Sequence, residues 1–295
     1  MRKLVGALAV ALLSTALVTP LNAITGNWVE DFEHPFVGLA VFYDANGEFL
    51  WRCSGTLLSP TVFLTAGHCA DTVSGAVSAR VYFQQDAGVN YDPATQLDPV
   101  TGYPEICAAG TEGVTCATSD QLYNFDFTGR LTLPNTHDVG LLILDQPITL
   151  SEYGQLVPIG TLDSLATSRQ TATVFTVSGY GLTYRPNANA PLITLSFRER
   201  LMAQSTLVNL NSALNDGFNL QTQGNGRGRG GTCSGDSGGP VFLGPYSSNL
   251  VVAVTSFGLN TLCRGTDFAY RVDTAAVQAW MEDTLGPALW AEIAP

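Results

Sequence analysis

Residues 232–240 read Thr-Cys-Ser-Gly-Asp-Ser-Gly-Gly-Pro, with glycines close on both sides of Ser237. Glycine permits a tight turn and a close backbone approach, so this turn would expose the serine hydroxyl and aim successive N–H groups at one point. Those are the requirements of a serine nucleophile. The same pattern also fits the strand-to-helix turn of an α/β-hydrolase, in which an acid and then a histidine follow the serine.

The order of the histidines excludes the α/β-hydrolase fold. The chain has three histidines, His34, His68 and His137, and all of them precede Ser237. A serine nucleophile needs a base, and histidine is the usual one. The fold must therefore bring an earlier histidine to a later serine.

Short apolar runs separated by turn residues predict an all-β chain. We expect strands at residues 37–43, 49–51, 62–65, 79–83, 139–144, 171–177, 241–243 and 250–255. Asn46-Gly47 between the first two runs predicts a hairpin. Helical periodicity occurs only near the end, where Asp273 and Thr274 are placed to cap a helix.

Two residues are candidates to assist the serine. His68 closes an apolar run, and Asp138 precedes the strongly apolar residues 139–144. A carboxylate at the mouth of a buried strand needs a partner to offset its desolvation. A histidine N–H is suitable, because the carboxylate then fixes the tautomer and stabilises the imidazolium. His137 is the alternative base, but adjacent strand residues face opposite ways, which disfavours a pair with Asp138.

Three segments, TAGHC at 65–69, HDVGLLIL at 137–144 and CSGDSGGP at 233–240, resemble in this order the signature segments of trypsin/chymotrypsin-like serine proteases. Further likenesses are the CSGTLL run at 53–58, VSGYG at 177–181, SFG at 256–258 and YRV at 270–272. The resemblance implies an all-β fold of two packed antiparallel six-stranded β-barrels with a C-terminal α-helix. The protease domain would cover 24–295, with barrels at about 24–150 and 151–272 and the helix at about 273–285.

The resemblance also implies the chemistry. Ser237 would be the nucleophile, His68 the general base and Asp138 the orienting carboxylate of a serine endopeptidase that acts on proteins or peptides. The backbone amides of Gly235 and Ser237 would form the oxyanion hole. A non-catalytic binding module and an esterase are the alternatives, although no triad residue is missing. Neither a cofactor nor a metal ion is expected.

The specificity pocket of this family departs from the trypsin pattern here. Preference for Arg or Lys is carried by an Asp six residues before the nucleophile, where this chain has Gly231. The expected pocket residues are Gly231, Thr232, Ser256, Phe257 and Gly258. Asp267 is either a substitute acid from another wall of the pocket or a solvated loop carboxylate.

The six cysteines lack any CxxC spacing, which disfavours a zinc ribbon. Taken with the expected export, they are predicted to form disulfides. The resemblance pairs Cys53 with Cys69 and Cys233 with Cys263, which leaves Cys107 with Cys116.

The N-terminus predicts export. Arg2 and Lys3 precede a mostly apolar run at 4–18 that Pro20 ends, so residues 1–23 are typical of a secretory signal cleaved after Ala23. A buried N-terminal helix is the alternative. In the family, a new amino terminus pairs with the Asp before the nucleophile, here Ile24 with Asp236. Signal cleavage would thus create the activating terminus of an extracellular or periplasmic enzyme.

Composition limits the partners. Thirteen basic against 25 acidic side chains give a net charge of −12, which disfavours nucleic acid despite the glycine- and arginine-rich residues 224–231. We expect a monomer with no membrane attachment after signal removal. Residues 84–127 are expected to be an acidic surface excursion; bound calcium is the alternative, but no EF-hand spacing occurs.

Overall fold

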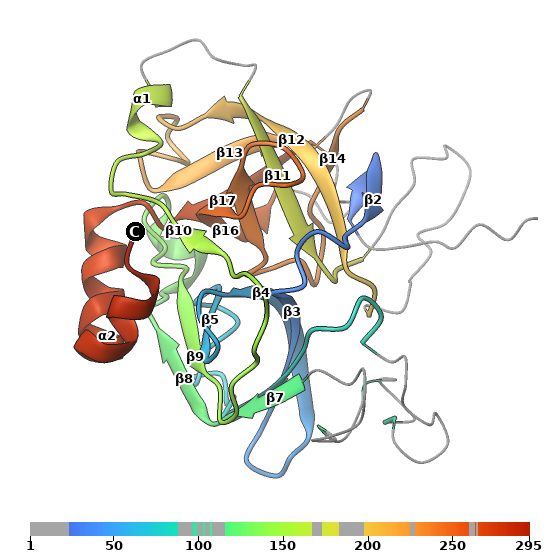
Figure 1. Cartoon of the computed structure of the whole chain (residues 1–295). Coiled ribbons are helices and arrows are strands. Elements are labelled where there is room, and N and C mark those ends of the chain that lie inside the picture. The colour runs from blue at the N-terminus through green and yellow to red at the C-terminus, as the bar shows by residue number, and fades with distance from the viewer. Residues whose placement is uncertain are drawn as a thin grey trace, which may run out of the picture.

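The computed structural model describes residues 24–87, 97–98, 103, 107, 116–166, 173–182, 198–224, 228–259, 263 and 265–295. Two β-sheet bodies lie against one another, with helix α2 beside them (Figure 1). The predicted signal, residues 1–23, and much of the predicted excursion at 84–127 lie outside the described residues.

Seven strands form the first sheet, and each neighbouring pair is antiparallel. Their spatial order is β7 (Cys116–Ser119), β6 (Ser78–Tyr82), β3 (Val37–Tyr43), β4 (Phe49–Leu57), β5 (Val62–Thr65), β9 (Gly140–Ile143) and β8 (Gln121–Asn124). The predicted β3–β4 hairpin is confirmed. Its turn is closed by the Asp44 carboxylate, which accepts hydrogen bonds from the amides of Asn46 and Glu48 at 2.9 and 2.8 Å.

The second sheet closes on itself, because β16 pairs with both β15 and β17. The ring contains β16 (Leu250–Gly258), β15 (Pro240–Leu243), β11 (Val174–Gly179), β12 (Leu201–Asn209), β13 (Asn219–Gln223) and β17 (Thr266–Arg271). Outside the ring, β2 (Trp28–Glu30) pairs with β12 and β10 (Gln155–Leu156) runs parallel to β16. The short strands β1 (Thr25–Gly26) and β14 (Gly230–Gly231) pair separately.

The predicted all-β class with two barrels and a terminal helix is therefore confirmed. The six-strand count holds for the closed ring. The first sheet instead has seven strands and stays open between β7 and β8, and the β10–β16 pair departs from a purely antiparallel arrangement. Local sequence pattern predicts strands, whereas closure depends on pairings between distant segments.

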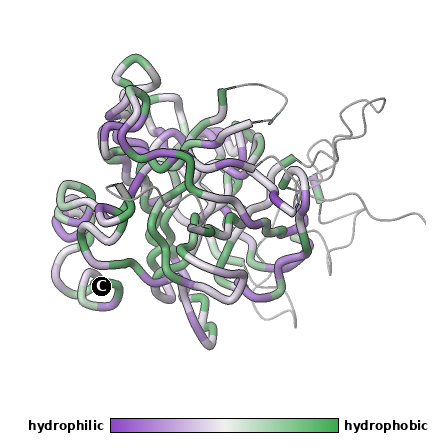
Figure 2. The backbone as a smooth tube through the Cα atoms, turned by 90° about the horizontal axis from the view of Figure 1, so that it is seen from above, coloured by the Kyte–Doolittle hydropathy of each residue, from purple (hydrophilic) through white to green (hydrophobic). Residues whose placement is uncertain are grey.

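Hydrophobic residues, green in Figure 2, gather along the strands in the middle of the molecule. One core cluster fills the first sheet and continues into the second through Phe242 and Val254. Another fills the closed ring and includes Ile24. All seven residues of β3 are buried, because one face packs into the barrel and the other against neighbouring elements. Burial stabilises by about 1.5–3 kcal/mol for each large apolar side chain, and the first cluster thereby holds the two bodies together.

Helix α2 (Ala275–Ile293) begins as predicted, with the Thr274 hydroxyl accepting a hydrogen bond from the Val277 amide. It ends eight residues later than the predicted boundary at 285. Gly286, at φ 69° and ψ 171°, and Pro287 interrupt the helix there, and a second helical segment follows. Proline suits the first turn of a helix, so the chain resumes helical structure after the break.

The remaining described elements are the 3-10 helix η1 (Gly129–Thr132) and the short helix α1 (Asp163–Ala166). Among the described residues, no helix has both the length and the hydropathy needed to cross a bilayer.

The three predicted disulfides, Cys53–Cys69, Cys107–Cys116 and Cys233–Cys263, are all present. Each links residues 9 to 30 positions apart. Such bridges stabilise the fold mainly by restricting the unfolded chain. The first also fastens the strand that carries Ser54 to the turn that carries His68, which positions the site described next.

Candidate active site

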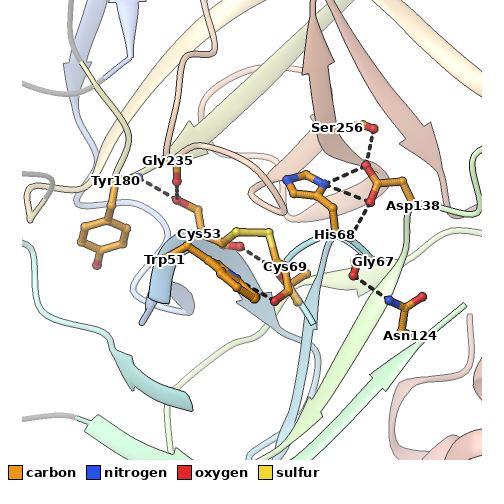
Figure 3. Close-up of a disulfide and its surroundings, with 12 residues drawn as sticks. Trp51, Cys53, Gly67, His68, Cys69, Asn124, Asp138, Tyr180, Gly235 and Ser256 are labelled. Atoms are coloured by element: carbon orange, nitrogen blue, oxygen red, sulfur yellow. Dashed lines mark hydrogen bonds and ion pairs between the residues drawn. A yellow bond between two sulfur atoms is a disulfide. The ribbon is translucent and has the colours of Figure 1, made fainter. Parts of the chain in front are cut away.

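His68 and Asp138 meet because of the strand pairing beneath them. Thr65, at the end of β5, pairs with Gly140, at the start of β9, so the residues just beyond each strand end lie together. The Nδ1 atom of His68 lies 3.0 and 2.9 Å from the two carboxylate oxygens of Asp138 (Figure 3). The His68 backbone amide also donates to this carboxylate at 2.8 Å.

Asp138 is almost wholly buried, whereas 29% of the His68 side chain is exposed. The Ser256 hydroxyl donates a further hydrogen bond to Asp138 from the second sheet. Burial alone would raise the pKa of Asp138, but the charge and hydrogen bonds of His68 and the Ser256 hydrogen bond together hold it below the usual range. Asp138 is therefore a carboxylate, and its position assigns a proton to His68 Nδ1 and leaves Nε2 as the basic nitrogen.

Ser256 was predicted only as a pocket residue. The structure instead joins its hydroxyl to Asp138, across 118 residues of sequence. No local pattern in the sequence predicts this contact, since Ser256 lies in a mostly apolar strand.

The turn that carries Ser237 is packed against the first sheet. The Ser54 amide donates to the Ser237 carbonyl at 2.8 Å, and the Ser54 hydroxyl donates to the Gly235 carbonyl at 2.9 Å. Gly238 has φ 77°, and a Cβ atom there would lie only 2.7 Å from the Ala66 nitrogen. The turn lies directly against the residues that lead to His68, and because of this close approach only glycine fits at position 238.

The Ser237 side chain itself forms no hydrogen bond to any described residue. Both its turn and the His68 turn are nevertheless attached to strand β4. Ser54 of β4 holds the Ser237 turn, and the preceding residue, Cys53, is joined by a disulfide to Cys69 (Figure 3). Cys53, Cys69 and His68 also lie within 4.8 Å of one another through their potential ligand atoms. The sulfur atoms are joined in a disulfide, so they offer no thiolate to a metal ion.

His137 does not share this arrangement. Its φ is 54°, and its ring lies 4.7 Å from the ring of Phe125, which in turn contacts Trp280 of α2. The His137 ring thus packs against Phe125, which also contacts α2. His34, the third histidine, is buried with Asp31 at a separate place and lies outside this site.

Asp236 is buried completely and accepts hydrogen bonds from the amides of Gly181 and Cys233 at 2.8 and 2.9 Å. Burial raises its pKa to about 7, despite these bonds, and nearby Asp267 adds to the shift. Within the described ranges, no cationic side chain pairs with Asp236. Ile24 is an internal residue in this chain, so its nitrogen is an amide; the residue is fully buried at φ 59°, and Thr25 beside it pairs with Gly231.

The predicted pocket residues lie in two groups. Ser256 and Phe257 lie near His68, whereas Gly231, Thr232 and Gly258 lie around Asp267. Gly231 and Thr232 contact Asp267, whose Oδ2 atom accepts a hydrogen bond from the Thr232 amide at 2.8 Å. Gly258 is the direct partner of Asp267 between β16 and β17. Asp267 is only 9% exposed, so the alternative of a solvated loop carboxylate is wrong. The local sequence could not show whether Asp267 is buried or exposed, because its burial results from the pairing of β17 with β13 on one side and β16 on the other.

A pocket of about 210 Å³ lies beside His68. Its lining residues are His68, Phe127, Thr136, Asp138, Ser256 and Phe257. Phe127 and Thr136 were not among the predicted site residues, and they reach the pocket because the chain between β8 and β9 returns over His68. Asn124 anchors this segment by donating to the Gly67 carbonyl at 2.8 Å and accepting from the Phe127 amide at 2.6 Å.

The chain matches the family model described as Trypsin over residues 32–281. Serine protease 7 of Drosophila melanogaster is 27% identical over 273 residues, covering 89% of this chain and 64% of that protein. Chymotrypsin of Phaedon cochleariae is 27% identical over 227 residues, covering 75% and 67%. Brachyurin of Leptuca pugilator is 26% identical over 218 residues, covering 72% and 79%. The match thus spans less than two thirds of the Drosophila protein.

Among solved structures, one titled HL collagenase superposes with a TM-score of 0.61. It is 18% identical and covers 88% of this chain and 98% of its own. At that identity the likeness concerns the fold alone.

Proposed function

The chain belongs to the trypsin family of serine proteases, and we propose that it is a serine endopeptidase that works through Ser237, His68 and Asp138. The observation that carries most weight is the hydrogen bond from His68 Nδ1 to a buried, ionised Asp138. Buried His34 forms a similar pair with Asp31, but His68 is 29% exposed and lines a pocket, so its imidazole can reach a substrate and gain orientation from the carboxylate as a general base. The Ser237 turn supplies the nucleophile and is held against strand β4 by Ser54.

In the proposed reaction, the Ser237 hydroxyl attacks the scissile carbonyl while His68 Nε2 takes its proton. The carbonyl oxygen becomes negative and is stabilised by the amides of Gly235 and Ser237. His68 then gives the proton to the leaving amine, and an acyl-enzyme forms at Ser237. Water repeats the sequence with His68 again acting as base, which releases the acid and restores the serine.

We also propose that Ile24 becomes the amino terminus when a signal at 1–23 is removed, and that its ammonium pairs with Asp236. A fully buried carboxylate with no cationic partner is costly, and an ammonium would offset that cost. Removal of the signal would thereby be coupled to folding of the Gly235–Ser237 turn. The same removal would place a single protease domain, residues 24–295, outside the cytosol as a monomer, in agreement with its three disulfides.

The substrates proposed are proteins or peptides, with the side chain before the scissile bond entering a pocket between Gly231, Thr232 and Gly258. Ser256 and Phe257 line the adjoining pocket beside His68, and Asp267 lies against Thr232 and Gly258. No cofactor or metal ion takes part in the proposed mechanism.

Labelling by a fluorophosphonate tests the catalytic assignment. We expect stoichiometric labelling of the processed protein, none in Ser237→Ala, and hydrolysis of unfolded casein. His68→Ala should lose both properties, whereas His137→Ala should keep them. A folded, processed protein that is not labelled would favour a non-catalytic binding module. Labelling with ester hydrolysis but without casein cleavage would favour an esterase.

A further inference from the structure

Asn124, the last residue of β8, joins two segments of the candidate active site through its side-chain amide. The Nδ2 atom donates a hydrogen bond to the Gly67 carbonyl at 2.8 Å (Figure 3), and the Oδ1 atom accepts one from the Phe127 amide at 2.6 Å. Turning the side-chain amide over would place oxygen against oxygen and NH2 against N–H, so these two partners fix its orientation. The two bonds therefore require both halves of the asparagine amide.

The bond to Gly67 holds one end of the peptide group that leads into His68. The Gly67 carbonyl and the His68 N–H belong to the same planar peptide unit and point in opposite directions. The carbonyl accepts a hydrogen bond from Asn124, and the N–H donates one to the Asp138 carboxylate at 2.8 Å. Because the unit is held from both sides, it cannot rotate without breaking one of these bonds.

The segment that Asn124 holds also packs tightly against the His68 turn. A Cβ atom added to Gly67 would lie 3.0 Å from the Phe127 Cβ atom and 3.1 Å from the Val139 nitrogen. The Phe127 ring centroid lies 5.8 Å from that of His68, with 52° between the ring planes. Asn124 thus anchors both the backbone that carries His68 and the aromatic ring that borders its imidazole.

We propose that Asn124 is a positioning residue for His68: it holds the Gly67–His68 peptide and the Phe127 ring so that the imidazole keeps the orientation that proton transfer requires. This inference rests on the proposed protease function. Asn124 is not among the residues that line the pocket beside His68, so it acts through its two partners rather than on the substrate. Misplacing a reacting group by about 1 Å can lower a rate by about 100-fold, so a small rotation of this peptide would slow the chemical step.

The experiment measures the second-order rate constant for fluorophosphonate labelling of Ser237 in the processed protein. A small fluorophosphonate carries no peptide chain, so its rate reports the serine and its base rather than contacts with an extended substrate. Asn124→Ala should be labelled about tenfold more slowly than wild type, or slower still. Its kcat for a peptide anilide, counted per labelled site, should fall by a similar factor while KM changes less.

Asn249→Ala is the matched control. Asn249 is likewise half-buried, and its side-chain amide also donates to a backbone carbonyl, that of Tyr153, at 3.2 Å. This variant should be labelled at the wild-type rate. A merely structural role for Asn124 would lower the free energy of unfolding or the fraction of protein that is labelled, but it would leave the rate per labelled site unchanged.

A second variant, Asn124→Asp, covers the case in which Asn124→Ala does not fold. Its carboxylate has nearly the shape of the asparagine amide and still accepts a hydrogen bond from the Phe127 amide. It presents an oxygen instead of a donor to the Gly67 carbonyl, however, and the two oxygens repel. Labelling should therefore also be slow, because the peptide before His68 is displaced.

The outcomes separate the two levels of the hypothesis. A folded, processed wild-type protein that is not labelled would overturn the proposed function and the role of Asn124 with it. A labelled wild type together with an unchanged labelling rate per site in either folded Asn124 variant would overturn the positioning role alone. A rise in KM for the anilide without slower labelling would do the same, because Asn124 would then act on substrate binding through Phe127.

Discussion

The backbone amide of Ser54 donates a hydrogen bond to the carbonyl of Ser237 at 2.8 Å, and this bond joins the two sheets at the candidate nucleophile. The Ser54 side chain adds two more links. Its hydroxyl donates to the Gly235 carbonyl and accepts from the Tyr180 amide at 2.8 Å. One serine on β4 thus holds both the proposed oxyanion turn and the end of β11.

Replacing Ser54 by Ala should therefore affect both stability and activity. The buried Tyr180 amide would lose its acceptor, which costs about 1–3 kcal/mol of unfolding free energy. The Gly235 turn would also lose an anchor, so kcat should fall more than KM changes. Urea unfolding and peptide anilide kinetics measure the two effects. Ser151→Ala, at an exposed serine, is the control, and equal behaviour of the two variants would show that Ser54 does not position the turn.

Gly238 permits a second test of the nucleophile turn. Gly238→Ala introduces strain at φ 77° and a clash with the residues before His68, so we expect loss of burst and strong destabilisation. Gly47→Ala is the matched control, because Gly47 has a similar φ of 81° but nothing within 4 Å of the added carbon. Its cost should be limited to about 1–2 kcal/mol of backbone strain. A Gly238→Ala enzyme with the stability and burst of Gly47→Ala would contradict the packing described above.

The buried Asp31–His34 pair should make folding sensitive to acid. His34 Nδ1 lies 2.9 Å from both oxygens of Asp31, and His34 Nε2 faces the Ser248 carbonyl at 3.1 Å. Burial would raise the pKa of Asp31, but His34, Arg200 and the Ser178 hydroxyl together lower it. Because the folded pKa lies below the unfolded value, this stabilisation is present above about pH 4 and is lost as pH falls through the folded pKa.

Asp31→Asn should consequently cost about 3–5 kcal/mol near neutral pH, since it leaves buried His34 without its hydrogen-bonded anion and removes the negative charge near Arg200. The difference from wild type should shrink below about pH 4, where Asp31 itself becomes protonated. Urea unfolding across this range, with disulfides intact, measures it, and Asp283→Asn serves as control. A difference that stays constant down to the lowest pH would show that ionisation of Asp31 does not contribute.

The proposed Ile24–Asp236 pair predicts a requirement for a free amino terminus. Protein that begins at Ile24 should be fully active, whereas protein with one extra residue or an acetylated Ile24 should show little or no burst. The α-amine has an ordinary pKa of about 8, and pairing raises it, so activity should be lost as pH rises through the raised value. Burst titration from about pH 7 to pH 11 measures this loss. Undiminished activity of the extended form would refute the pair.

Several features were predictable because they depend on neighbouring residues. The hairpin at 44–48 follows from Asn46-Gly47 between apolar runs, and the start of α2 follows from the cap at Thr274. The resemblance of three ordered segments also predicted the family, the two-barrel fold and all three disulfides. The helical segment beyond Gly286 was not predictable in this way, because the local glycine and proline signals indicate an end.

The amino-acid sequence by itself determined which residues can do chemistry, since the segments at 65–69, 137–144 and 233–240 single out one histidine, one acid and one serine. Tertiary structure decided how those residues are used. It joined Ser256 to Asp138, packed His137 against Phe125 and buried Asp267 between two strands. Each of these outcomes depends on contacts between segments far apart in the chain. Local pattern and propensity do not encode such contacts, whereas strand pairing and burial fix them.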